Sequence, residues 1–509
     1  MTLQSKRIAH PELFFGFVAP IGADIKSCVN EFREYLKAAD YNVIELKVTD
    51  IFPLLAELIK PKEPLVPKPI ADRYRTHIAY GNQIRRYFND DAALAAMTIA
   101  RLMRDRVRKA KGSFEKNAFL IHQFKRPDEI SLFRSLYGRL FFQISIYSRR
   151  GARVDFLSRR FASDASSANA KQFRSDAENI INRDEHESDE PHGQRVSKIF
   201  HDAEFIINTD INEPSIAQQV HRFCDLLFGS NGISPTKIEY GMFIAKAAAL
   251  RTLDLSRQVG AAIFSNTMEI ISMGSNEVPK AGGGTYWADD TIDDREYRRG
   301  IDSNDKRKRE ILGDLLKRLG STEDVDEVIK KKEVKDSQLM DSLEYGRIVH
   351  AEMLAISDAA RSGRSVNQAS LFCTTFPCHM CAKHIVAAGI KDVVFLEPYP
   401  KSLASDLHSD SILIEGADRG AYDNFPFVNF SHFYGVSPRR YREFFERDKR
   451  KDADGNFQKW RDVQPRPIID IKVPFYPDLE ASVLRVEIEG YLQRSEEQRE
   501  ALSRVLSPA

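Results

Sequence analysis

Four side chains in the second half of the sequence have the types and spacing of a metal site with a proton-transfer group beside it: His350, Glu352, Cys378 and Cys381. Two cysteines three residues apart on the first turn of a helix face the same side and can bind the same ion. His350 supplies a third ligand. Three protein ligands leave one position for water, as at a catalytic zinc. Glu352 can then accept a proton from that water and return it to a substrate.

The cysteine pair by itself leaves other interpretations open. The segment PCHMC, residues 377–381, also fits half of a structural zinc site or a redox pair. The HAE motif at 350–352 favours the catalytic interpretation. His379 is rotated away from the cysteine face, and Cys373 is interpreted as a buried core cysteine.

The elements around these motifs must bring them together. Residues 351–361 have helical character and residues 370–375 read as a strand, so each motif opens a helix at the same end of a sheet. A helix over 240–253 and a hairpin formed by residues 259–265 and 269–275 precede them. The charged stretch 289–340 intermixes both signs and predicts a solvated helical insertion.

The first half of the sequence alternates strand-like and helical patterns, which predicts a parallel α/β sheet. The expected strands are 13–18, 41–48, 117–124, 140–147 and one that ends at Asn208, and the expected helices include 25–38 and 214–228. The polar stretch 154–195 predicts an exposed lid or linker. A Gly/Ser/Asn/Pro breaker after residue 228 places the boundary between a domain of residues 1–232 and a second of 233–509.

Composition limits the classes of function. A chain of 509 residues is long enough for two or three domains. No apolar run is long enough for a membrane span, and the N-terminus lacks the order of a signal peptide, so we expect no membrane anchor. Five sparse cysteines indicate a reducing compartment, and we expect the cytoplasm. Basic and acidic residues number 75 and 74, so the formal net charge of +1 is too small to attract nucleic acid.

H-x-E followed by P-C-x-x-C is the signature of zinc deaminases. Residues 240–445 resemble the deoxycytidylate deaminase branch of the cytidine deaminase superfamily. The resemblance is carried by SRQVGAAIF, SMGSNEVP, VHAEMLAI, FCTTFPCHMCAKHIVAAGIKDVVFLEPY and VNFSHFYGVSPRRY. It implies an α/β/α domain with a five-stranded sheet, a Zn²⁺ cofactor, a substrate-binding role for Asn276, phosphate contacts near Ser256 and Arg257, and a homo-oligomer. In the glycine-rich loop 279–290, Trp287 or Tyr286 can stack on a base, although a plain mobile loop fits equally.

The whole chain resembles the bacterial anti-phage dCTP deaminases, which join a P-loop-kinase-like domain to a deaminase. The first half contributes KRPDEISLFRSLYGRLFF and RDEHESDEPHGQRVSKIFHDAEFIIN. This implies deamination of deoxycytidine nucleotides, which depletes the pool that a phage needs. The phosphate-binding motif departs from the family pattern, because Gly16 and Gly22 are followed by Ala23 and Asp24 instead of Lys and Ser/Thr. We therefore expect a regulatory nucleotide to bind at this turn without hydrolysis.

Two other functions stay open on the sequence alone. A deaminase that edits tRNA or single-stranded DNA requires a basic, aromatic groove. A nucleotide-sensing regulator would use the first half as its working part and the deaminase half as its effector. The sequence does not decide between dCTP and dCMP, and an inhibitory RNA or another antitoxin partner is not readable from it.

Overall fold

The computed structural model describes residues 8–187, 190–399, 401–415, 417–447, 450–460, 465–469 and 471–485. The chain forms two units, one made of Met1–Ser234 together with Tyr434–Ala509, and one made of Pro235–Phe433. Each has its own six-stranded sheet, which agrees with the mixed α/β class expected from the sequence. The expected division at 232/233 differs at the far end, because residues from Tyr434 onward return to the first unit.

The sheet of the first unit is parallel except at one edge. Its strand order is β12-β5-β4-β1-β3-β2, and only the two-residue β12 runs antiparallel to its neighbour. The strands are β1 (Leu13–Val18), β2 (Asn42–Lys47), β3 (Asn117–His122), β4 (Phe141–Tyr147), β5 (Phe205–Asn208) and β12 (Gly435–Val436). Every residue of β1 and β3 is buried, as expected for the centre of a parallel sheet with both faces covered.

Helices pack on both faces of this sheet. Phe15 contacts Phe32 of α1, and Phe32 contacts Phe223 of α9, whereas the neighbouring Phe14 stacks on Tyr137 of α5. The helices of the first unit are α1 (Ile25–Ala38), α2 (Phe52–Leu58), α3 (Ile70–Phe88), α4 (Ala93–Ala110), α5 (Pro127–Tyr137), α6 (Arg150–Asp164), α7 (Arg174–Glu185), α8 (Val196–Phe200), α9 (Ile216–Leu227), α18 (Tyr441–Phe445) and α19 (Pro477–Val483), with short 3₁₀ turns at Val48–Ile51, Gly138–Leu140, Ala170–Phe173 and Pro438–Arg440.

The polar stretch 154–195 is largely helical rather than a linker. Helices α6 and α7 bury a small apolar cluster of their own: Val154, Leu157, Phe161, Ala177 and Ile181. These residues recur three or four positions apart, which is the helical period. The surrounding Ser, Asn, Asp and Glu residues dilute this pattern, so composition alone suggested an exposed connection.

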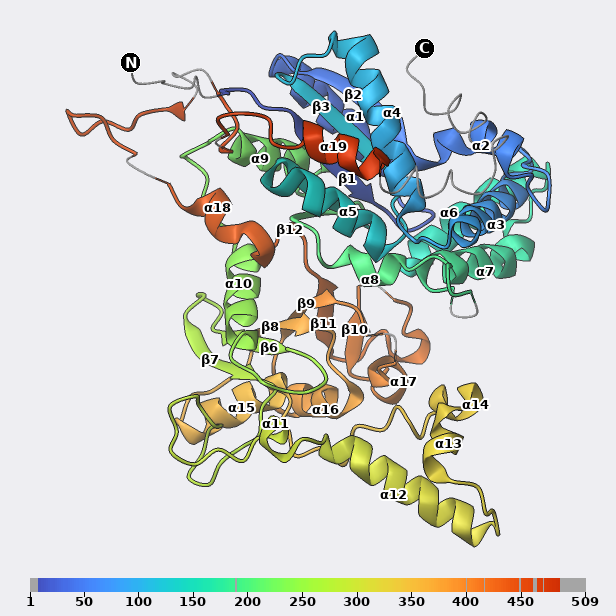
Figure 1. Cartoon of the computed structure of the whole chain (residues 1–509). Helices are drawn as coiled ribbons and strands as arrows, with labels where there is room; N and C mark the ends of the chain where they lie inside the picture. Colours follow the sequence, from blue (N-terminus) through green and yellow to red (C-terminus); the bar gives the residue numbers. More distant parts are fainter. Residues whose placement is uncertain are drawn as a thin grey trace. The chain divides into compact units, whose positions relative to one another are not determined.

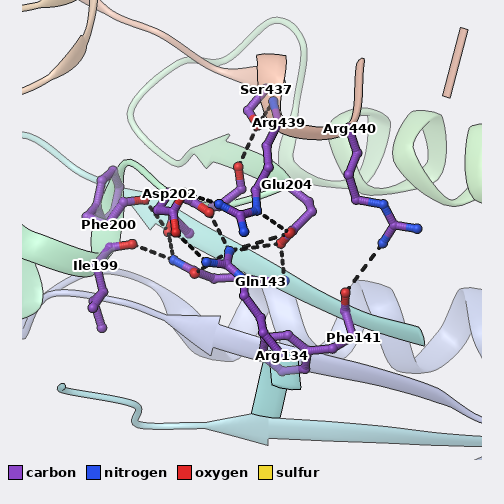
Figure 2. A network of polar contacts seen from close by, with 12 residues as sticks. Arg134, Phe141, Gln143, Ile199, Phe200, Asp202, Glu204, Ser437, Arg439 and Arg440 are labelled. Carbon is purple, nitrogen blue, oxygen red and sulfur yellow. Dashed lines mark hydrogen bonds and ion pairs between the residues drawn. The ribbon is translucent and has the colours of Figure 1, made fainter. Parts of the chain in front are cut away.

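The segment that follows the second unit pairs with β5, at the edge of the first sheet (Figure 2). Gly435 and Val436 pair antiparallel with Ile206 and Phe205 of β5. Next to them, Ser437 donates a hydrogen bond to the carbonyl of Ala203 at 2.5 Å. The second unit is thus an insertion into the chain of the first unit, between α9 and β12.

Ion pairs between charged side chains also join this segment to the first sheet. Arg439 lies 3.1 Å from the carboxylate of Glu204, and Arg134 lies 3.4 Å from the same carboxylate. Glu204 is almost fully buried and also accepts the backbone N–H of Gln143 at 2.6 Å. Figure 2 shows the two guanidinium groups meeting Glu204 and Asp202 from the two segments. The buried carboxylate is therefore compensated by groups from both.

The sheet of the second unit is mixed, in the order β10-β11-β9-β8-β6-β7 (Figure 1). The expected hairpin is present as β6 and β7, and β8, β9, β11 and β10 run parallel to one another. The strands are β6 (Gly260–Phe264), β7 (Ile270–Ser275), β8 (Ser370–Thr375), β9 (Asp392–Glu397), β10 (Ile412–Ile414) and β11 (Val428–His432). The short β10 adds a sixth strand to the five that the resemblance implied.

Helices cover both faces of this sheet too. A Cβ atom at Gly260 would lie 2.0 Å from the carbonyl oxygen of Ala245 in α10, and one at Gly274 would lie 2.0 Å from that of Ala351 in α15. Only glycine allows these close approaches on opposite faces. The helices are α10 (Lys237–Ala249), α11 (Glu296–Arg299), α12 (Ser303–Arg318), α13 (Val325–Lys330), α14 (Lys332–Lys335), α15 (Ala351–Arg361), α16 (His379–Ala387) and α17 (Ala404–Leu407), with a 3₁₀ turn at Gly420–Tyr422. Among the described residues, no helix has the length and apolar character to cross a bilayer.

Candidate active site

Two helices of the second unit begin with the predicted metal-binding residues. His350 is the N-cap of α15, and Cys378 is the N-cap of α16, which follows β8. Cys381 lies in the first turn of α16, three residues after Cys378, so the two sulfur atoms face the same side. The close contact of α15 with Gly274 of β7 sets the position of His350 relative to the sheet.

The three donor atoms converge as a tetrahedral metal requires. Nδ1 of His350 lies 3.3 Å from the Sγ of Cys378 and 3.4 Å from the Sγ of Cys381, and all three donor atoms lie within 4.8 Å of one another. A zinc ion with usual bond lengths and tetrahedral angles separates nitrogen from sulfur by about 3.5 Å. Two thiols and an imidazole are also the donor set that zinc prefers. The residues therefore fit a zinc ion with one position left for a non-protein ligand.

The donors influence one another's protonation. A hydrogen bond from Cys381, and then one from His350, lower the pKa of the Cys378 thiol to about 4, although burial opposes the shift. The hydrogen bond to Cys378 raises the pKa of His350 to about 9. Cys378 is therefore a thiolate at neutral pH, the form that binds metal. Metal binding at Nδ1 of His350 must displace a proton.

Glu352 lies beside the three donors in the first turn of α15. Its side chain is only 4% exposed, and its Oε2 accepts a hydrogen bond from the Sγ of Cys381 at 3.4 Å. Burial raises the pKa of the Glu352 carboxyl above its usual range. A carboxyl whose pKa is raised by burial is suited to accept a proton from water and pass it on.

These residues form one end of a cavity of about 330 Å³. Its lining includes His350, Glu352 and Cys378, together with Phe376 and Tyr399. The volume lies near the lower end of the roughly 300–1,000 Å³ typical of small-molecule sites. The cavity therefore has room for one small-molecule ligand beside His350, Glu352 and Cys378.

One protein-family model matches the part of the chain that contains these residues. Residues 235–397 match the model of the cytidine and deoxycytidylate deaminase zinc-binding region. The second unit thus contains a deaminase-type zinc-binding region. The deoxycytidylate deaminase of Homo sapiens is 25% identical over 158 residues, which cover 31% of this chain and 63% of that protein. The deoxycytidylate deaminase of Enterobacteria phage T2 is 46% identical over 54 residues, or 11% of this chain and 29% of that protein. The chain thus spans less than two thirds of the length of these relatives.

Solved structures of deaminases were also found. A dCMP deaminase from the cyanophage S-TIM5 in complex with dCMP and dUMP shares 19% sequence identity, with a TM-score of 0.23. The similarity covers 39% of this chain and 98% of that one. The apo form of the same cyanophage enzyme shares 17% identity with a TM-score of 0.22, over 40% of this chain and 100% of that one.

Asn276 follows β7 and lines the same cavity of the deaminase region. Its side-chain oxygen accepts the N–H of Val259 at 2.7 Å, and its amide nitrogen donates to the carbonyl of Arg257 at 2.6 Å and to the carboxylate of Asp254. The predicted substrate-binding asparagine therefore also holds the 254–259 loop in place. A substrate contact remains a prediction for this residue.

Ser256 and Arg257 lie on that loop and line the cavity. Both are exposed, and the guanidinium of Arg257 lies 3.4 Å from Glu397 and 5.5 Å from the ring centre of Tyr399. An exposed arginine at the rim can pair with a phosphate. Phosphate binding by these two residues stays a prediction.

Trp287 does not line this cavity in the structure. Its side chain is half exposed, and the guanidinium carbon of Arg251 lies 3.5 Å from its ring centre. The glycine-rich loop closes on itself, because Lys280 and Gly284 are joined by a backbone hydrogen bond of 3.1 Å. The loop is thus a tight turn packed beside Arg251.

Sequence reasoning missed one wall of the cavity. The N-cap and the first two turns of α12, in the charged insertion, contribute Asp302, Asn304, Asp305 and Lys308 to the lining. Lys308 is only 6% exposed and donates to the carbonyl of Met340 at 2.9 Å. A lysine buried within a charged helix carries no local signature, because its burial results from a segment 32 residues further along the chain.

The two glycines of the predicted nucleotide-binding turn lie in the first unit. Gly16 lies within β1, where a Cβ would lie 2.5 Å from the ring of Phe141. Close packing against this ring therefore explains why the residue is a glycine. Gly22 has a positive φ of 93° and lines a separate cavity of the first unit. The structure therefore brings one of the two glycines to a cavity, and nucleotide binding by either is still a prediction.

Proposed function

We propose that the chain is a zinc-dependent hydrolase that deaminates deoxycytidine nucleotides, dCTP or dCMP, to deoxyuridine nucleotides. The observation that carries this proposal is the convergence of His350, Cys378 and Cys381 beside the buried Glu352 at one end of a cavity. The match of residues 235–397 to the deaminase zinc-binding region supports it. Depletion of the deoxycytidine nucleotide pool would then protect a host cell against a DNA phage.

The chemistry follows from the groups that line the cavity. In hydrolytic deamination, water adds at C4 of the cytosine ring, N3 gains a proton, the bond from C4 to the exocyclic nitrogen breaks and ammonia leaves. Bound zinc supplies Lewis-acid activation of water at neutral pH. Glu352 takes a proton from the water and delivers protons to N3 and to the leaving amine. Phe376 and Tyr399, at the cavity wall, can pack against the ring.

A free nucleotide suits the cavity better than a nucleic acid does. The cavity is a compact space of about 330 Å³, and its α12 wall contributes acidic as well as basic side chains. A strand would instead require a continuous basic groove with aromatic residues for stacking. The balance of 75 basic and 74 acidic residues in the whole chain agrees with a small substrate.

One incubation tests the proposal. Full-length protein is mixed with equimolar CTP, dCTP, dCMP, deoxycytidine and dATP, and the products are identified by mass spectrometry. We expect a gain of about one dalton, which corresponds to replacement of NH by O, on dCTP or dCMP. No conversion of any cytosine compound would reject deamination of free nucleotides, and conversion of deoxycytidine alone would reject the nucleotide requirement.

Glu352→Ala is the matched variant for this assay. It should keep its zinc and lose roughly 10²- to 10⁴-fold in rate, because only the proton-transfer group is removed. Cells that express the wild-type chain should lose deoxycytidine nucleotides and resist a DNA phage, whereas cells that express the variant should do neither. Wild-type turnover by Glu352→Ala would contradict the role given to this residue.

A further inference from the structure

A second cavity, in the first unit, lies beside the turn that follows β1. Its volume is about 170 Å³. The turn from Ala19 to Ala23 forms one side, and α3 forms another. The lining combines apolar side chains with polar ones: Phe52, Ile78 and Leu94 with Arg73, Arg85 and Gln194. An apolar concave site with a few polar groups is the usual form of a small-molecule site.

The backbone of this turn is already hydrogen-bonded to a negatively charged side chain, the carboxylate of Asp184. The N–H of Ile21 donates to the carboxylate of Asp184 at 2.7 Å, and Asp184 is fully buried. Lys125 pairs with the same carboxylate at 2.7 Å and donates to the carbonyl of Ala19 at 3.0 Å. A backbone amide and a nearby lysine that could bind a phosphate are thus occupied by an internal carboxylate. A ligand phosphate at the turn would have to displace Asp184.

Two buried polar atoms of the cavity lining have no partner within the ranges that the structure describes. They are Nε of Arg85, a donor, and Oε1 of Gln194, an acceptor. The two side chains are only 3% and 7% exposed. Arg85 is held by Glu129 at 2.7 Å, so its free donor is fixed in place. Buried polar groups are nearly always hydrogen-bonded, so this pair indicates a ligand that presents an acceptor and a donor.

Volume and charge narrow the class of ligand. Sites that enclose a whole drug-sized ligand have volumes of roughly 300–1,000 Å³, and this cavity is smaller. It has room for one ring of a ligand, and the remaining atoms of the ligand would lie outside the cavity. Arg73 also lines it, and no carboxylate of the described residues pairs with its guanidinium. A free guanidinium at the rim is suited to a phosphate. A nucleotide meets these requirements, because it joins a planar ring that carries a donor and an acceptor to a phosphate.

We propose that this cavity binds the base of a nucleotide, with Arg85 and Gln194 hydrogen-bonded to the edge of the base and Arg73 paired with its phosphate. The phosphate therefore lies at α3 and not at the Gly22 turn. The inference concerns the first unit alone and does not depend on deamination. The site differs from the predicted phosphate loop in both its residues and the part of the ligand that they recognise.

Isothermal titration of the full-length protein tests this inference. The ligands are dAMP, dGMP, dTMP and their three nucleosides, none of which contains cytosine. We expect one or more of the monophosphates to bind, and Gln194→Leu to weaken both the nucleotide and its nucleoside by about tenfold, since a hydrogen bond to the base is lost. Arg73→Met should weaken the nucleotide to a similar degree and leave the nucleoside unchanged.

Matched controls and a second measurement keep the test decisive. Arg75→Met, on the same helix but exposed and paired with Glu63, and Gln172→Leu, on the surface, should bind like the wild type. Hydrogen exchange of wild-type protein should slow in peptides from 70–88 when the nucleotide is added. Absence of binding by all three monophosphates, or equal affinity in the wild type, Gln194→Leu and Arg73→Met, would overturn the proposal. Unchanged exchange in 70–88 would do so as well.

Discussion

Cys381 is the most deeply buried of the three proposed zinc ligands. It is fully buried, and its Sγ contacts both Nδ1 of His350 and the carboxylate of Glu352. Each of the other two donors reaches the metal position from the N-cap of a helix. Cys381 therefore links the metal position to the proton-transfer group, which makes it the sharpest single test of the site.

Cys381→Ala should lose both metal and activity. The wild type is expected to carry about one zinc ion per chain, and two remaining ligands do not hold a catalytic zinc. Metal content is measured by inductively coupled plasma mass spectrometry, alongside the deamination rate. Cys28→Ala, which removes a buried thiol of the first unit, is the control and should keep its zinc. Full zinc occupancy in Cys381→Ala would remove this residue from the site.

Helix α12 forms one wall of the cavity with its N-cap and its first two turns. Lys308 donates to the carbonyl of Met340 and pairs with Asp305 at 2.7 Å, and Asn304 donates to the carbonyl of Ser342 at 2.8 Å. These bonds hold α12 to the segment that leads into His350. The charged insertion therefore contributes to the wall of the cavity, which its composition did not reveal.

Lys308→Met should raise KM by roughly tenfold with little change in kcat. We expect this wall to contact parts of the substrate that do not react, and loss of such contacts weakens binding of the ground state and of the transition state equally. Steady-state kinetics on the accepted nucleotide and a zinc assay measure the effect. Lys317→Met, at the exposed far end of the same helix, is the matched control. A fall in kcat at unchanged KM would show that Lys308 takes part in the chemistry itself.

The two ends of the first unit meet in one buried ionic cluster. Arg106 of α4 lies 2.8 Å from Glu12 and 2.7 Å from Glu480 of α19. Tyr476 and Tyr137 donate to these carboxylates at 2.8 and 2.9 Å. Burial raises the pKa of the Glu12 carboxyl. One arginine therefore compensates two carboxylates that come from distant parts of the chain.

Arg106→Met should destabilise the first unit by about 3–5 kcal/mol, because both carboxylates lose their buried counter-charge. Unfolding in urea is followed by the fluorescence of Trp460, which lies in the first unit, in a Trp287→Phe background. Arg108→Met, exposed on the same helix, is the control. The loss of unfolding free energy in Arg106→Met should become smaller as pH falls, because protonation removes the uncompensated negative charge of the two carboxylates. A loss that is independent of pH would contradict this explanation.

Much of the site could be predicted because its signals are local. Cys378 and Cys381 are spaced for one helical turn at the start of α16. His350 and Glu352 lie two residues apart at the start of α15, the helix that precedes α16 in the sequence. The strands of the first sheet were likewise predicted from short apolar runs. The stretch 154–195 was misread because its sparse apolar residues are diluted by polar ones, although their helical spacing is present in the sequence.

The amino-acid sequence alone predicted the candidate donor set, the candidate proton-transfer group and most of the helices and strands, because residue type and periodicity act over a few positions. The tertiary structure decided which distant segments meet. It placed Lys308 in the wall of the cavity, packed Trp287 beside Arg251 and returned the segment after Phe433 to the first unit through the two-residue β12. Such contacts depend on burial and on the pairing of charges between segments remote in the chain, and no local pattern in the sequence records them.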